Sequence, residues 1–257
     1  MAVQSINDDF PVLATVGKAF AAPVMNARQL VHVLWPWVLA MVPVLLIYGW
    51  LAWPWMERAI TGDSEARLAL GWTGTLLSVP FLSGIAVGWH RFLLRGELAH
   101  GAGRIWAYAL SAAAIWAAAN IAASVGLWLL RSPTPEGGLV ALILTCVFSV
   151  LALRVSLILP AVAVASSVSW REVWKVTSGH TWPILFGAIL AAAPIFIGQI
   201  ALGTLISPDI TQFGYVLSTL ALGLAEAVLL VVTVGYLSFA YHWFFERNGS
   251  PGRASYS

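Results

Sequence analysis

The sequence has few charged residues for its length. Asp, Glu, Lys and Arg make up 9% of its 257 residues, and hydrophobic residues make up 60%. A soluble domain carries about 25% charged residues, because its surface faces water. This chain could not cover such a surface. The composition therefore predicts that lipid is the solvent for most of the molecule.

Other absences narrow the range of functions. A single cysteine, Cys146, excludes an intramolecular disulfide and the thiolate clusters that hold zinc or iron–sulfur centres. A net charge of +2, with no basic run, argues against nucleic acid as a partner. No Gly-x-Ser-x-Gly, His-Glu-x-x-His or phosphate-binding glycine loop occurs. The histidines lack the spacing of metal ligands. The sequence therefore predicts no catalytic residue, no metal site and no cofactor.

Long apolar runs recur along the whole chain. Six of them are long enough to cross a hydrocarbon core of about 30 Å at about 1.5 Å per residue. They cover residues 30–56, 68–93, 105–130, 139–161, 183–206 and 215–245. No connection is long enough for a folded soluble domain. We therefore expect residues 1–257 to form one all-α, polytopic transmembrane helix bundle of about six spans.

Basic residues give the expected orientation. With the N-terminus in the cytoplasm, the outer loops hold only Arg58, Arg67 and Arg131, whereas the inner segments hold most of the other basic residues. Short loops rich in Lys and Arg stay on the cytoplasmic side, so both termini are predicted to be cytoplasmic. Heavy use of Ala, Gly and Leu, with Arg in place of Lys, is typical of a GC-rich bacterial gene. We therefore expect a location in a bacterial inner membrane.

One cytoplasmic segment has the pattern of a short helix lying in the membrane interface. Ser169 and Glu172 have the spacing of a capping box, and Val168 and Val173 that of a hydrophobic staple. Trp170 and Trp174 share a face with Val173, whereas Arg171 and Lys175 lie off that face. The alternatives for this helix are an ordinary amphipathic connection and a lipid-sensing element.

A weaker amphipathic pattern precedes the first span. Val12, Val16 and Phe20 share a helical face, and Lys18 lies off it. We expect Pro23 to break this helix.

Two segments of the chain resemble two others. The pattern aromatic-His-x-Phe-x-x-Arg occurs from Trp89 to Arg95 and again from Tyr241 to Arg247. A basic residue also stands seven positions before a Trp-Pro pair at both Arg28 and Lys175. These matches predict a parallel internal repeat, about 24–97 and 169–249. The alternative is chance matching within the aromatic belts at membrane ends.

Two charged residues lie inside predicted spans. Glu226 is about 17 Å, and Arg154 about 22 Å, from the outer end of its helix. Because an isolated charge in hydrocarbon is costly, we expect an Arg154–Glu226 pair. Such a pair either fixes the packing of two helices or acts as a proton, ion or substrate counter-charge.

Two further groups of residues carry predictions. His90, Arg91, Arg95 and Glu97 form the densest polar stretch, and we expect them either to contact an anion or lipid headgroup or to anchor the helix end. Gly84 and Gly88 form a Gly-x-x-x-Gly motif, which allows close helix packing within one bundle or between subunits.

Three short motifs carry a family resemblance. They are Trp-His-Arg-Phe at 89–92 followed by Gly-Glu at 96–97, Arg154 with Pro160, and Ser-Trp-Arg-Glu at 169–172. With these, most of the chain resembles multi-span bacterial inner-membrane proteins without an assigned reaction, which are distantly similar to the membrane region of glycerophosphodiester phosphodiesterases. The resemblance implies a location and no mechanism, because that group has no assigned reaction. The phosphodiesterase activity is not carried over, because the sequence shows no acid-rich soluble region.

Two functions remain open from the sequence. The first is a scaffold, assembly or accessory subunit without enzymatic activity, with membrane lipids, other membrane proteins or a second copy as partners. The second is a transporter or channel for a small solute, ion or lipid that uses Glu226 and Arg154.

Overall fold

The computed structural model describes residues 9–98, 104–130, 135–204 and 210–247, and these ranges contain helices and no strand. This confirms the all-α class. The elements are α1 (Val12–Met25), α2 (Ala27–Leu51), α3 (Trp53–Ile60), α4 (Ser64–Arg95), α5 (Ile105–Leu130), α6 (Pro135–Ser156), α7 (Ile158–Ala163), α8 (Trp170–Val176), α9 (Thr181–Thr204), α10 (Gln212–Tyr241) and the π-helical turn η2 (His242–Arg247).

Several helices have the length and composition of membrane spans. Four segments qualify by themselves: Ala27–Leu51, Ser64–Arg95, Cys146–Ala163 and Gln212–Glu246. A fifth is added if α8 and the first part of α9, bent by 103° at their junction, count as one span. The apolar helices therefore mark a multi-pass membrane protein. The number six and the orientation stay predictions, although α5 covers the same residues as the third expected span.

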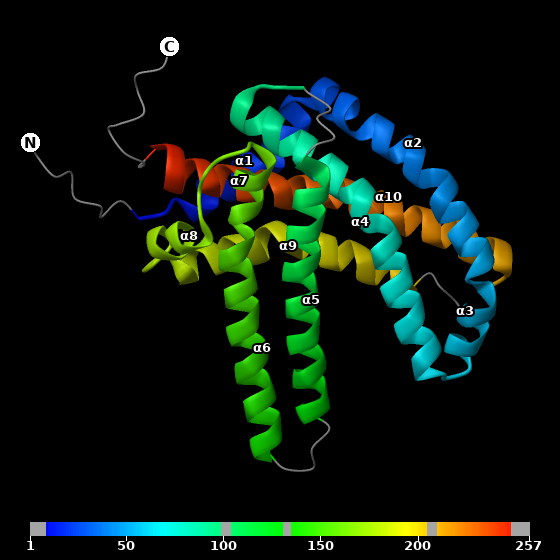
Figure 1. Ribbon diagram of the computed structural model, residues 1–257. Helices are drawn as coiled ribbons and strands as arrows, with labels where there is room; N and C mark the ends of the chain where they lie inside the picture. Colours follow the sequence, from blue (N-terminus) through cyan, green and yellow to red (C-terminus); the bar gives the residue numbers. More distant parts are fainter. Residues whose placement is uncertain (1–8, 99–103, 131–134, 205–209, 248–257) are drawn as a thin grey trace, which may run out of the picture.

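α10 is the helix around which the others pack. It contacts α1, α2, α4 and α9, whereas α5 and α6 pair with each other. Figure 1 shows α5 and α6 as a hairpin that projects at a steep angle from α9 and α10. The hairpin is attached near the beginning of α5, where Tyr108 is buried, and near the end of α6, where Arg154 is buried. Those two residues therefore matter most for where the hairpin lies.

The beginning and end of the described chain lie together. The ring of Phe10 stacks on Phe244 with centroids 5.2 Å apart and meets Trp243 edge-on at 5.3 Å. All three side chains are buried. We call this end of the bundle the terminal end. Which side of a membrane this end faces stays a prediction of the sequence.

α1 differs in one respect from its sequence pattern. Val16 is buried, as expected, and Phe20 is 38% exposed. The helix continues through Pro23 to Met25, so the predicted break at Pro23 is wrong. The proline removes one backbone donor, but the backbone N–H of Asn26 still donates to Ala22 at 3.0 Å. The helix therefore ends at Met25, with Asn26 as its C-cap.

α8 begins at the predicted capping box. The backbone N–H of Ser169 donates to Glu172 Oε2 at 2.6 Å, and the backbone N–H of Glu172 donates to Ser169 Oγ at 3.3 Å. Two donors that a helix N-terminus leaves without intrahelical partners are thereby satisfied. Val173 is buried, and Val168 packs against the same apolar cluster. Local sequence therefore determined where this helix starts.

The two glycines of α4 bring that helix close to α2. A Cβ added to Gly88 would lie 2.8 Å from Cγ1 of Val33, and one added to Gly84 would overlap the ring of Trp37. Val33 and Trp37 both belong to α2. In this structure the Gly-x-x-x-Gly motif therefore serves packing within the chain.

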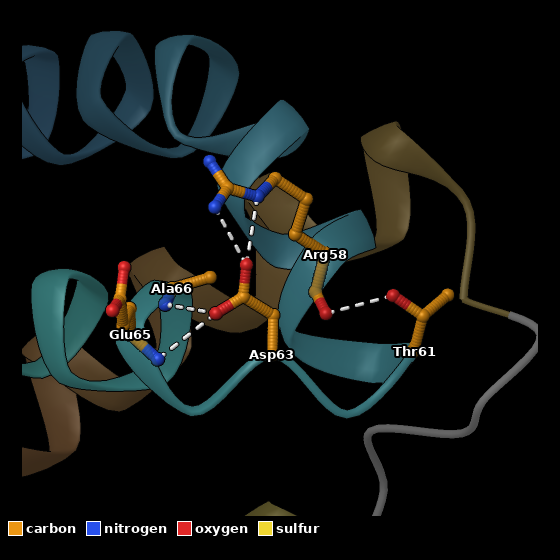
Figure 2. Close-up of polar contacts among 5 residues, drawn as sticks. All are labelled: Arg58, Thr61, Asp63, Glu65 and Ala66. Atoms are coloured by element: carbon orange, nitrogen blue, oxygen red, sulfur yellow. Dashed lines mark hydrogen bonds and ion pairs between the residues drawn. The ribbon is translucent and has the colours of Figure 1, made fainter.

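The turn between α3 and α4 is held by Asp63 (Figure 2). Its Oδ1 accepts hydrogen bonds from the backbone N–H groups of Glu65 at 2.9 Å and Ala66 at 3.1 Å. Its Oδ2 accepts from Arg58, at 2.9 Å from Nε and 2.6 Å from a terminal nitrogen. These hydrogen bonds, first that of Ala66 and then that of Arg58, lower the pKa of Asp63. The turn therefore contains a charged N-cap as well as a surface ion pair.

Candidate functional site

Arg154 joins the end of α6 to α8. Its Nε donates to Thr177 Oγ1 at 3.0 Å, and a terminal nitrogen donates to the carbonyl oxygen of Trp174 at 2.6 Å. The guanidinium also lies over the Trp174 ring, 3.7 Å from the centroid. Arg154 is 8% exposed and Thr177 is fully buried. A planar cation that stacks on a ring and donates at its edge suits this position well. We call this group, Arg154 with Trp174 and Thr177, the Arg154 clamp.

The clamp holds α8 in one orientation. Thr177 Oγ1 donates in turn to the carbonyl oxygen of Val173 at 2.7 Å, so the cation is tied to the last turn of α8. On the outer surface of α8, Trp170 is 60% exposed, and Arg171 and Lys175 are also exposed. Exposed Trp beside Arg and Lys is the composition expected at a membrane interface.

The predicted pair of Arg154 with Glu226 is not formed. Across the described residues, the ion pairs within 4.0 Å do not include either residue. Glu226 lies half-buried in α10 and, within the same ranges, has no hydrogen bond to another side chain or to the backbone. Similar depth was the reason to expect the pair, but depth does not say on which side of a helix a side chain lies. Arg154 instead contacts the helix that follows it in the chain.

The polar residues of the stretch 90–97 have different surroundings in the structure. His90 is fully buried, so it cannot contact a headgroup. Arg91 pairs with Glu97 at 3.3 Å, and Arg95 pairs with Glu246 at 3.8 Å. Each arginine therefore already faces a carboxylate of its own chain, which leaves little net positive charge for an anion.

His90 instead connects three helices. Its Nδ1 lies 2.7 Å from Ser238 Oγ on α10, and its Nε2 lies 3.2 Å from the Tyr108 hydroxyl on α5. Ser238 Oγ donates its own hydrogen to the carbonyl oxygen of Val234 at 2.9 Å. A neutral ring with its proton on Nδ1 then donates to Ser238 and accepts from Tyr108, so every polar group is satisfied. The arrangement is that of a structural contact.

Sequence reasoning missed Ser238, Tyr108 and Glu246. The carboxylate of Glu246 lies 2.6 Å from His242 Nδ1 and also pairs with Arg95 at 3.8 Å. The spacing of four residues between His242 and Glu246 was a usable signal, because such residues are neighbours on a helix. No pattern along the chain points from His90 to Ser238, which lies 148 positions away.

Neither metal-ligating side chains in the described ranges nor comparisons with known proteins point to a further functional site. Within the described ranges, no three His, Cys, Asp or Glu side chains lie close enough to share a metal ion. No protein-family model, curated protein or solved structure matches the chain. The resemblance to the membrane region of glycerophosphodiester phosphodiesterases therefore stays a prediction.

Proposed function

We propose that this chain is a multi-pass protein of a bacterial inner membrane that works as a scaffold, assembly factor or accessory subunit and contacts lipid headgroups. The observation that supports this most is how its polar side chains are used. His90 with Ser238 and Tyr108 ties α4, α10 and α5 together, and the Arg154 clamp ties α6 to α8. Tyr236 adds a bond from α10 to α9, by donating to the carbonyl oxygen of Ile184 at 2.8 Å. Polar side chains that hold helices together in this way suit a rigid platform.

The surface of α8 is the part of the platform best suited to a partner. It presents Trp170 and two cations, and the clamp ties its last turn to α6. A preorganised helix loses less conformational entropy on binding than a mobile one. We therefore expect α8 to contact headgroups, a membrane-protein partner or both.

The direct test is to isolate the tagged protein in native nanodiscs and quantify the proteins that accompany it. A scaffold or accessory subunit should carry a partner in fixed stoichiometry. Trp170→Ala should reduce that partner's yield, whereas Trp182→Ala, a change at a 76% exposed tryptophan on α9, should not. A protein that is always isolated alone, at native expression, would overturn the proposal.

A second candidate function is supported by Glu226. A half-buried carboxylate in a long apolar helix, without a partner among the described residues, is a recognised feature of proton and ion pathways. The test is decay of a pH gradient in liposomes of phosphatidylethanolamine and phosphatidylglycerol that contain the purified protein. Transport predicts fast decay that Glu226→Gln abolishes and Glu65→Gln, at an exposed position, retains. Decay no faster than in protein-free liposomes would exclude proton movement.

A further inference from the structure

A groove of about 880 Å³ opens beside the first turns of α2. One wall is formed by α2 and the other by Leu98, which follows the end of α4. Its lining changes character along α2. Arg28 and Gln29 come first, Val31 and His32 follow, and Trp35 and Pro36 lie further along the helix. The groove thus has a polar end and an apolar end.

Charge distinguishes the polar end from its surroundings. Arg28 is exposed and makes no ion pair with any residue in the described ranges. The nearby arginines of α4, Arg91 and Arg95, both face carboxylates. Arg28 is therefore the cation of this groove that remains available to an anionic ligand. Gln29 and His32 place two further polar side chains within about one helical turn of it.

The apolar end indicates what accompanies the anion. Val31 is 60%, Trp35 59% and Leu98 41% exposed, and Leu39, one turn beyond Trp35, is 52% exposed. These side chains continue the stripe that begins at Arg28, because positions 28, 32, 35 and 39 share one face of a helix. A free phosphate ion would leave this apolar surface uncovered. A lipid would cover it with an acyl chain while its phosphate lies against Arg28.

We infer that this groove binds an anionic phospholipid, with its phosphate headgroup at Arg28 and an acyl chain along Trp35 and Leu39. The inference deepens the proposed contact with lipid headgroups and adds a headgroup site on α2 to the one expected on α8. Tryptophan at the level of the headgroups and a cation just outside it are the usual arrangement at a membrane interface. Arg28 supplies bidentate donors for phosphate, which a lysine cannot.

Native mass spectrometry of the full-length protein in a non-ionic detergent tests the inference. The protein is titrated with dioleoyl phosphatidylglycerol or with dioleoyl phosphatidylcholine, which has the same chains and no net charge. We expect tighter binding of phosphatidylglycerol. Arg28→Gln should weaken that binding by roughly fivefold, the effect of about 1 kcal/mol per basic residue at a membrane surface. Lys18→Gln, at an exposed cation on α1 outside the groove, removes the same charge and should leave the affinity unchanged.

Several results would overturn the inference. One is equal binding of both lipids by the natural protein, and another is equal binding of phosphatidylglycerol by Arg28→Gln and the natural protein. If millimolar inorganic phosphate displaces the lipid completely, the site takes the free anion. Arg28→Lys keeps the positive charge. If this variant retains part of the affinity, the loss in Arg28→Gln comes from a lost contact with the lipid and not from misfolding.

The result is independent of the partner search. If phosphatidylglycerol binding depends on Arg28 but no partner protein is found, the scaffold proposal fails and the lipid site stands. If a partner is found and Arg28→Gln changes nothing, the reverse holds.

Discussion

Arg154 is the residue whose neighbours say most about its role. It is a buried cation without a carboxylate partner in the described ranges, stabilised by a hydroxyl, a carbonyl oxygen and an indole ring. Removing the cation should therefore release α8 without leaving an opposite charge unpaired inside the bundle. That distinguishes the clamp from a buried ion pair, in which removal of one partner leaves the other charge uncompensated.

We expect Arg154→Met to loosen α8. The variant keeps much of the side-chain volume but loses two charge-assisted hydrogen bonds, which contribute roughly 1.5–3 kcal/mol each. Limited trypsin digestion should then cut faster at Arg171 and Lys175, and the thermal midpoint should fall. The matched control is Arg171→Met, at an exposed position on α8. Because this variant lacks the cleavage site at Arg171, only the rate of cleavage at Lys175 is compared. Unchanged cleavage at Lys175 in Arg154→Met would contradict the clamp.

Asp63 gives a prediction on pH. Its folded-state pKa is lowered, so its stabilisation of the fold is present above the unfolded value of about 3.9 and is lost as pH falls through the folded value. Asp63→Asn retains a capping side chain and removes the charge. The variant should melt below the natural protein at neutral pH, and the two midpoints should converge at low pH. A pH-independent deficit in Asp63→Asn would contradict the prediction.

At the scale of elements, α4 shows how much of a helix is determined locally. Asp63 caps its beginning, Gly96 ends it with a φ of 68°, and both are visible in the sequence as ordinary helix signals. The partner of its glycine face was not visible. A Gly-x-x-x-Gly motif predicts close approach to some helix, and the structure identifies α2.

Gly88→Ala tests that contact. The added methyl would lie 2.8 Å from Val33 Cγ1, so α2 and α4 must separate or Val33 must move. Overpacking of this kind costs about 1–3 kcal/mol. Gly71→Ala is the control in the same helix, because nothing lies within 4 Å of its added Cβ. We expect a lower thermal midpoint for Gly88→Ala alone, measured in detergent; equal midpoints would show that this glycine is not at a tight contact.

At the scale of the whole molecule, the question is which end faces the cytoplasm. Phe10, Trp243 and Phe244 place the start and end of the described chain at one end of the bundle. From there the chain runs through α2, a helix long enough to cross a membrane, and through the short α3 to the turn that contains Arg58 and Asp63. The distribution of basic residues then predicts that the terminal end is cytoplasmic and the α3–α4 turn is outside.

Labelling of single cysteines tests this orientation. In a Cys146→Ser background, Lys18→Cys and Glu57→Cys place thiols at exposed positions on α1 and α3. A membrane-impermeant maleimide should label Glu57→Cys in intact spheroplasts, and should label Lys18→Cys only after the membrane is opened. The opposite pattern would reverse the orientation, and labelling of both in intact spheroplasts would contradict an odd number of crossings between them.

The sequence by itself determined the apolar helices, the capping box of α8 and the approximate position of the four segments that are long and apolar enough to cross a membrane. These depend on hydrophobic length and on contacts between residues a few positions apart, which a linear pattern contains. Only the tertiary structure decided the partners of Arg154, His90 and Arg95, because these depend on which side of each helix faces which neighbour. Depth along a span is encoded by position in the chain, whereas rotation about the helix axis is determined by packing against other helices. The pairing of Arg154 with Glu226 was therefore wrong in this structure, and the groove at Arg28 became visible only once α2 and α4 had been placed together.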